Sequence, residues 1–102
     1  MSVVVIVRFP GGRLDRWKEV YADNAETMRK IAVEARGKGA IHHAFVEDEN
    51  GDVMVVDEWS SMAEFEAFFA TQDEIKAVMG QIGMTGPPTT VSYAVQDTPD
   101  RF

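Results

Sequence analysis

The feature that most constrains the fold is a pair of segments with strand character, separated by a short turn sequence. Residues 41–48 and 53–59 are rich in β-branched and aromatic residues, and Glu49-Asn50-Gly51-Asp52 lies between them. Asn-Gly tolerates the positive φ angles of a type I′ turn, so this sequence predicts a β-hairpin with Asn50 and Gly51 as its two loop residues. The two segments are therefore expected to be antiparallel neighbours in one sheet.

The segments before this hairpin predict a strand and then a helix. Residues 3–9 are nearly all apolar and β-branched, and Pro10-Gly11-Gly12 follows them, which predicts a strand that stops at a turn. From residue 14 to residue 35, apolar side chains recur at steps of three and four, the pattern of an amphipathic helix. Gly37 and Gly39 are expected to end this helix.

The segment after the hairpin predicts two short helices. Ser61 and Glu64 form a capping box, and Thr71 and Glu74 repeat it, so we expect a bend near Gln72. The aromatic positions in this region are spaced to face inward, and they are Phe65, Phe68 and Phe69.

The order of these elements predicts a ferredoxin-like fold. Residues 89–95 form a last strand, so the order is β-α-β-β-α-β, an α+β domain with a four-stranded antiparallel sheet and helices on one face. We expect a single domain over residues 1–96 and a polar tail over residues 97–102.

The first strand is apolar on both of its faces, although the predicted helices cover only one. Val3, Val5 and Val7 alternate with Val4 and Ile6. A monomer would leave a large apolar patch in water, so the uncovered face predicts a homodimer.

Length, charge and composition exclude several classes of protein. The chain has 102 residues, of which 45 % are hydrophobic and 26 % charged, as expected for one globular domain. No apolar run approaches the ~20 residues of a membrane span, and the start does not resemble a secretion signal, so a cytoplasmic protein without a membrane partner is expected. A net charge of −7 opposes binding to nucleic acid. Cysteine is absent, which excludes disulfides and Cys-based zinc sites.

The predicted hairpin register brings a histidine, an indole and a carboxylate together. With a two-residue loop, His42 faces Trp59, and Ala44 faces Asp57. One face of the hairpin would then carry His42, Ala44, Val46, Val55, Asp57 and Trp59, a set typical of the lining of a ligand cavity. A bulge would shift this register by one residue.

The opposite face of the hairpin is expected to carry an exposed ion pair between His43 and Glu58. Adjacent histidines on a strand point to opposite faces, so they cannot bind one metal ion. No glycine-rich nucleotide-binding loop is present either. Neither a metal nor an organic cofactor is therefore expected. Tyr93 and Arg8 could each add a polar group to a site.

Three parts of the chain resemble the antibiotic biosynthesis monooxygenase family. They are the strand ending in Phe9-Pro10, the run Val55-Val56-Asp57-Glu58-Trp59-Ser60-Ser61 with Phe65 after it, and Gly83-Met84-Thr85-Gly86-Pro87-Pro88 before the last strand. The resemblance implies the dimeric α/β barrel fold. It also implies, from the cofactor-free branch that acts on aromatic polyketides, a cavity between sheet and helices lined by Trp59. The chain departs from that branch at Val55, in place of an asparagine, and at Phe65, in place of a tyrosine. The heme-degrading branch is not matched, because Phe68 stands where that branch has a tryptophan.

These observations lead to the hypothesis of a cofactor-free monooxygenase that oxidises a planar hydroxylated aromatic molecule with O2. His42 is expected to act as the base and Asp57 to orient it, because an imidazole suits proton abstraction near neutral pH. Trp59 and Phe65 are expected to stack on the substrate rings. The remaining substrate-binding candidates are Val55, Ala44 and Tyr93. Two alternatives stay open: an isomerase or lyase on the same scaffold, and a ligand-binding or dimerising module without catalysis.

Overall fold

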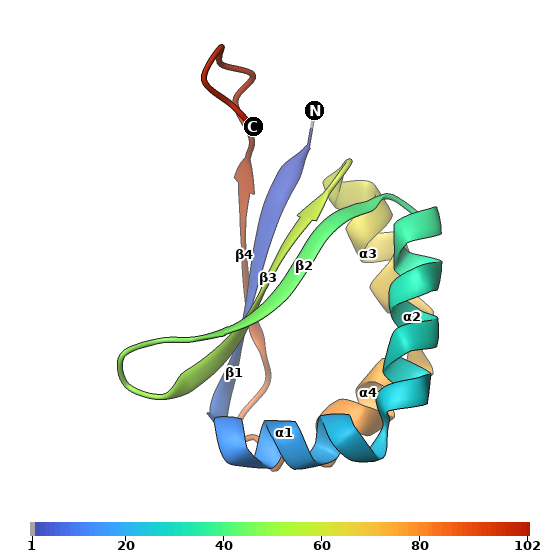
Figure 1. Ribbon diagram of the computed structural model, residues 1–102, viewed down its shortest axis with the longest axis vertical. Coiled ribbons are helices and arrows are strands. Elements are labelled where there is room, and N and C mark those ends of the chain that lie inside the picture. Colours follow the sequence, from blue (N-terminus) through green and yellow to red (C-terminus); the bar gives the residue numbers. More distant parts are fainter. Residues whose placement is uncertain (1) are drawn as a thin grey trace.

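The computed structural model describes residues 2–102, so Met1, the first residue of the predicted domain, lies outside the described residues. The elements are, in chain order, β1 (Val3–Arg13), α1 (Leu14–Asp23), α2 (Ala25–Gly37), β2 (Ala40–Glu47), β3 (Asp52–Trp59), α3 (Met62–Ala70), α4 (Asp73–Gly80) and β4 (Thr89–Ala94). The strands form one antiparallel sheet in the order β2-β3-β1-β4, and the helices lie on one side of it (Figure 1). This arrangement confirms the predicted ferredoxin-like α+β fold.

Strand β1 does not stop at the predicted turn. Arg8 pairs with Met54, and the next pair along β1 joins Arg13 to Asp52, so residues 9–12 form a bulge opposite a single residue of β3. The extra residues bend β1 and carry it directly into α1, as bulges do in other sheets. The expected end of the strand at Pro10 is therefore wrong.

A close approach between two loops explains the glycine within this bulge. Gly11 has φ +75°, and a Cβ atom placed on it would lie 2.5 Å from Cγ2 of Thr85. The Thr85 N–H donates a hydrogen bond of 2.8 Å to the carbonyl oxygen of Pro10. The segment that follows α4 thus docks against the bulge, and only glycine fits there.

The predicted first helix is two helices. Asn24 has φ −121° and ψ 22°, which are not helical, and its Nδ2 donates a 2.8 Å hydrogen bond to the carbonyl oxygen of Val20. Such a side-chain bond competes with the helical backbone, and the chain changes direction between α1 and α2 (Figure 1). The predicted apolar stripe nevertheless faces the sheet, since Trp17 on α1 and Ile31 on α2 are both buried.

The second helical region follows the prediction in its bend and differs in its caps. Ser61 is the N-cap of α3, and its Oγ accepts a 3.2 Å hydrogen bond from the Glu64 N–H. Gln72 separates α3 from α4, which confirms the predicted bend. The second capping box is wrong, because the Thr71 hydroxyl instead donates to the carbonyl oxygen of Phe68 at 3.2 Å.

The core fills the space between the helices and one face of the sheet. We call this face the inner face, and its buried residues include Val5, Val55, Asp57 and Trp59. The other face, the outer face, carries Val4 and Ile6, which are partly exposed. The alternation predicted for the first strand is therefore confirmed. Within residues 2–102, no helix has the length and apolarity to cross a membrane.

Candidate functional site

The hairpin between β2 and β3 has a three-residue loop. The Asp48 N–H donates to the carbonyl oxygen of Asp52 at 3.0 Å, and the Gly51 N–H donates to the carbonyl oxygen of Asp48 at 3.1 Å. The Asp48 carboxylate also accepts bonds from the N–H groups of Asn50 and Asp52, at 2.9 and 3.0 Å. Gly51 has φ +84°, whereas no non-glycine residue among 2–102 has a positive φ. The loop is therefore a type I turn followed by a left-handed glycine, and not the predicted type I′ turn.

This extra loop residue shifts the register by one and exchanges the faces of β2. His43 pairs with Asp57, and Phe45 pairs with Val55, so both side chains lie on the inner face. His42 pairs with Glu58 on the outer face, where its side chain is 76 % exposed. The predicted grouping of His42 with Asp57 and Trp59 is wrong for this reason.

The centre of the inner face is a hydrogen-bonded histidine and aspartate. His43 Nδ1 lies 2.6 Å from Asp57 Oδ1, and Trp59 Nε1 donates to Asp57 Oδ2 at 3.2 Å. The Asp57 side chain is 4 % exposed, whereas the His43 side chain is 46 % exposed. An ionised Asp57 accepts both bonds, which places the proton of a neutral His43 on Nδ1 and leaves Nε2 with a free lone pair. A sheltered carboxylate thus orients an accessible imidazole.

Aromatic rings adjoin this pair on the β2 side. The ring centroid of Phe45 lies 5.3 Å from that of His43, 5.0 Å from that of Tyr21 and 4.6 Å from that of Trp17. Tyr21 and Trp17 come from α1, so this helix and β2 together form an aromatic wall. The wall has the flat apolar surface that stacks on planar rings.

Two polar groups lie within the aromatic wall. Burial raises the pKa of the Tyr21 phenol above its ordinary value, and the negative charge of Asp57 raises it further. The hydroxyl therefore stays protonated at neutral pH and can donate a hydrogen bond. Trp17 Nε1 is the one buried side-chain nitrogen or oxygen among residues 2–102 that has no hydrogen-bond partner.

A second group of rings adjoins the pair on the α3 side. The Trp59 ring lies 5.8 Å from Phe65 and 5.3 Å from Phe68, measured between centroids. Trp59 and Phe65 are both buried, as is Val55, which lies next to Asp57 on the inner face of β3. These three predicted binding residues lie on the same side of the sheet as Asp57.

The other predicted site residues lie on the outer face. Ala44 pairs with Val56, and Tyr93 pairs with Val4, so neither shares a face with Asp57. The ion pair expected between His43 and Glu58 is also wrong, because it is His42 that approaches Glu58, at 3.9 Å.

Glu58 is held chiefly by the two ends of the chain. Arg101 donates to Glu58 Oε2 at 2.8 Å, and the Ser2 hydroxyl donates to the same oxygen at 2.8 Å. The polar tail is thus connected to the outer face of the sheet. Among residues 2–102, no three His, Asp or Glu side chains are grouped as ligands of a metal ion would be.

No sequence pattern predicted His43, Phe45, Tyr21 and Trp17 as site residues. His43 and Phe45 of β2 were assigned to the wrong face of the sheet because the turn type was mispredicted. The residue that indicates the correct turn type is Asp48. Aspartate is favoured at the first position of a type I turn, where its side chain binds the backbone N–H two residues on. Tyr21 and Trp17 belong to the predicted helical stripe, and nothing in their spacing separates site residues from core residues.

The four-stranded sheet with helices on one face is the fold of solved cofactor-independent oxygenases and antibiotic biosynthesis monooxygenases. SnoaB, a cofactor-independent oxygenase from Streptomyces nogalater, matches with a TM-score of 0.64 and 12 % identity over 98 % of both chains. A monooxygenase from the gene ActVA-Orf6 of Streptomyces coelicolor, in complex with nanaomycin D, matches with a TM-score of 0.67 and 18 % identity. That match covers 95 % of this chain and 88 % of the other.

Rv0793 from Mycobacterium tuberculosis is similar to the same degree, with a TM-score of 0.64 and 18 % identity, over 98 % of this chain and 100 % of the other. No protein-family model matches the chain, and no curated protein matches it in sequence. At these identities the solved structures show a shared fold, and the ferredoxin-like fold of one chain that the family resemblance implies is confirmed.

Proposed function

We propose that the protein is a cofactor-free monooxygenase that oxidises a planar hydroxylated aromatic molecule with O2. The observation that carries this proposal is the 2.6 Å contact between His43 and Asp57 on a face walled by aromatic rings. It is supported by the fold shared with SnoaB, a cofactor-independent oxygenase. The base is reassigned from His42 to His43, since only His43 lies on the inner face with Asp57.

The proposed reaction begins with proton transfer from a substrate phenol or anthrone to Nε2 of His43. Asp57 holds the Nδ1 proton and stabilises the imidazolium that forms. The resulting carbanion or phenolate is electron-rich and passes one electron to O2, and the two radicals combine into a carbon–oxygen bond. The peroxide anion takes the proton back from Nε2 of His43, and the resulting hydroperoxide loses water as its O–O bond breaks, which leaves a carbonyl group. The substrate supplies all the electrons, so each O2 yields one quinone oxygen and one water.

The surrounding rings orient the substrate. A planar substrate would stack against Phe45, while the neutral Tyr21 hydroxyl donates to a substrate oxygen. A site with few polar groups also favours the electron transfer, because bulk water would otherwise solvate the reacting anion.

The test compares two adjacent histidines. The full chain is incubated with 1,8-dihydroxyanthrone in an oxygen electrode, and quinone formation is followed by absorbance. His43→Ala is expected to lower the rate by about 10²–10⁴-fold, the usual contribution of a general base. His42→Ala, on the outer face of the same strand, is the matched control and is expected to keep the wild-type rate.

Equal rates for the two variants would contradict the role of His43. Turnover of a ketone substrate without O2 would favour the isomerase or lyase alternative, which the same base could serve. A ligand-induced rise in melting temperature without any turnover would favour a binding module.

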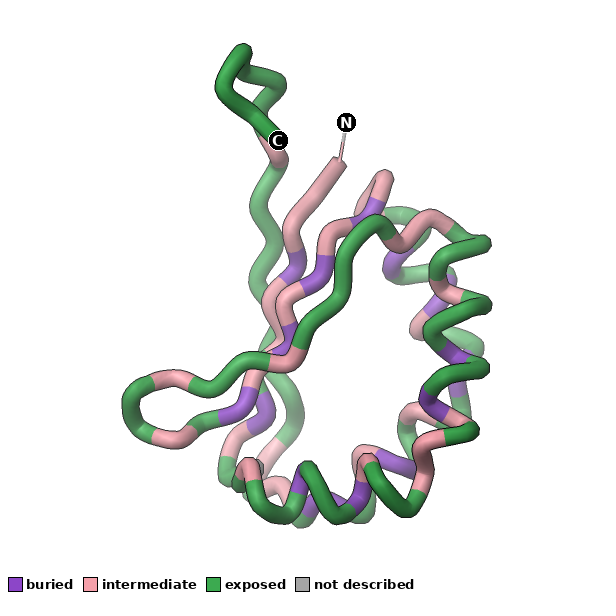
Figure 2. The backbone as a smooth tube through the Cα atoms, in the orientation of Figure 1, coloured by how far each residue is buried: buried purple, intermediate pink, exposed green. Residues whose placement is uncertain are grey.

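We further propose that the outer face binds a second copy of the chain. All residues of β4 are exposed, including Val91 at 47 % and Tyr93 at 57 %, and no helix covers this side (Figure 2). Val46 of β2 extends the same face and is 37 % exposed. Across a two-fold axis, these apolar residues of one copy would contact the same residues of the other copy, which removes them from water.

A further inference from the structure

Two carboxylates border the part of the aromatic wall that β2 contributes. His43, Phe45 and Glu47 follow one another on the inner face, because side chains alternate along a strand. Glu47 pairs with the buried Val53 of β3, and Asp57 lies opposite His43. Among the described residues of β2 and β3, Asp57 and Glu47 are the only Asp, Glu, Lys or Arg side chains on this face. A flat ligand stacked on Phe45 would therefore lie between two negative charges.

Neither carboxylate is neutralised by a strong cation. Within residues 2–102, no lysine or arginine forms an ion pair with Asp57 or Glu47. Because Asp57 is buried, little water screens its charge. Its field reaches the aromatic wall, since burial raises the pKa of the Tyr21 phenol and the charge of Asp57 raises it further. Asp57 thus opposes a second negative charge beside Tyr21.

The proposed reaction also creates an anion on this face, but it creates a cation with it. His43 takes the proton of the substrate, so the anion forms together with an imidazolium that Asp57 holds. A carboxylate that a ligand brings from water has no such counter-charge, and it loses hydration when it enters. The face therefore compensates the charge that is made within it and not a charge that is carried in.

We propose that the site selects uncharged aromatic ligands and rejects those that carry a carboxylate, with Asp57 and Glu47 as the residues that determine this specificity. The inference rests on the proposed function, because it takes the inner face as the ligand site, and it adds the charge of the substrate. It follows that an aromatic acid must lose or mask its carboxylate, by decarboxylation or esterification, before it can be oxidised here.

The experiment compares two anthraquinones of nearly the same shape that differ in charge. One is 1,8-dihydroxy-3-hydroxymethylanthraquinone, which is neutral, and the other is its 3-carboxylate analogue. Each is titrated into the full chain at neutral pH. Binding is followed by quenching of tryptophan fluorescence, since Trp17 and Trp59 adjoin the site. The neutral ligand is expected to bind about tenfold more tightly, the effect of one partly screened like charge.

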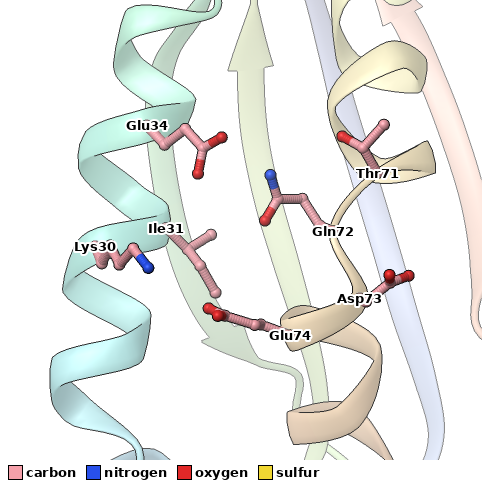
Figure 3. Close-up of a pocket in the computed structure, with 7 residues that line it drawn as sticks. All are labelled: Lys30, Ile31, Glu34, Thr71, Gln72, Asp73 and Glu74. Carbon is pink, nitrogen blue, oxygen red and sulfur yellow. The ribbon is translucent and has the colours of Figure 1, made fainter.

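Three variants separate local from overall charge. Asp57→Asn is expected to reduce the affinity ratio to about threefold or less, because it removes the buried charge. Glu47→Gln, at an exposed side chain, should reduce the ratio about two- to threefold while the core stays intact. Glu74→Gln is the matched control, because Glu74 lines a separate groove between α2 and the junction of α3 and α4 (Figure 3). It should leave the ratio unchanged.

Equal affinities of the two ligands would overturn the proposal, and so would a failure of both to bind. Equal effects of Glu47→Gln and Glu74→Gln would also overturn it, because they would show only the overall charge of an acidic protein. Oxidation of an anthrone is measured separately in the oxygen electrode. Selection by charge without oxidation would contradict the oxygenase and leave this inference standing, whereas oxidation with equal affinities would do the reverse.

Discussion

Asp57 combines two roles that make it the central residue of the inner face. Its two carboxylate oxygens separately bind His43 and Trp59, so it fixes the imidazole on one side and the indole on the other. A carboxylate that is almost fully buried and accepts two side-chain hydrogen bonds is costly to replace. Its proposed contribution to the reaction is to hold the proton on Nδ1 of His43.

Asp57→Asn should therefore impair the proposed reaction while the fold is retained. The amide can donate to Nδ1 of His43, which moves the ring proton to Nε2 and removes the free lone pair. We expect the rate of anthrone oxidation to fall by about 10²–10⁴-fold. The signal of the Nδ1 proton in the NMR spectrum should be lost at the same time. Glu58→Gln, on the outer face of the same strand, controls for the loss of one charge, and an equal loss in both variants would contradict the role given to Asp57.

Tyr21 predicts a change in stability at alkaline pH. Its pKa is raised above the ordinary value of 10.0, chiefly by burial and then by Asp57, so the folded state binds the proton more tightly than the unfolded state. The free energy of unfolding should therefore fall as the pH rises above that value. Tyr21→Phe removes this contribution to the pH dependence of stability. In urea unfolding measured from neutral to strongly alkaline pH, the free energy of unfolding of the variant should therefore fall less steeply with pH than that of wild type. Parallel curves for the two proteins would contradict the raised pKa.

At the scale of elements, the bulge in β1 determines how the segment after α4 docks on the sheet. The backbone passes so close to Thr85 that no side chain fits at Gly11, and the φ angle of this residue also requires glycine. The bulge and the loop are therefore coupled, although they lie far apart in the sequence.

Gly11→Ala should destabilise the protein by about 1–3 kcal/mol, the usual cost of backbone strain at a left-handed position. The steric contact with Thr85 adds to this cost. Gly37→Ala is the matched control, because a Cβ there meets no atom within 4 Å and Gly37 is part of α2. It should be neutral or slightly stabilising, since alanine is the better helix former. Thermal unfolding of both variants checks the difference.

The elements and their order were predictable from local patterns, whereas the register of β2 was not. Strand and helix periodicity identified the sheet and the helical stripe of Trp17 and Ile31, and the capping signals predicted the bend at Gln72. The hairpin loop depends on the competition between two turn types that both accept Asn50 and Gly51, and the side chain of Asp48 decides it. The break at Asn24 likewise depends on one side-chain hydrogen bond that periodicity does not reveal. The face predicted to carry Val55, Asp57 and Trp59 is therefore observed on β3, whereas the predicted faces of β2 are inverted.

At the scale of the whole molecule, the two faces of the sheet have different environments. The helices cover the inner face (Figure 1), and the outer face presents apolar side chains beside the ion pair between Glu58 and Arg101. The proposed dimer would bury these apolar side chains and leave the inner face of each copy to its own ligand.

Val91→Glu tests this arrangement. A charge on the outer face of β4 should oppose the contact between copies, so sedimentation should show a dimer for wild type and a monomer for the variant. Thr90→Glu places the same charge on the neighbouring residue of the opposite face and should leave the dimer intact. A wild-type monomer at micromolar concentration would contradict the proposal.

The tandem histidines of β2 have a consequence for a slip in the register of this hairpin. If Glu49 paired with Asp52, Asn50 and Gly51 would form a two-residue loop, and every side chain of β2 would turn to the opposite side of the sheet. Phe45 would leave the aromatic wall, but His42 would then lie on the inner face, opposite Trp59. A slip of one residue therefore keeps an imidazole on the inner face, while the stacking surface around it is lost.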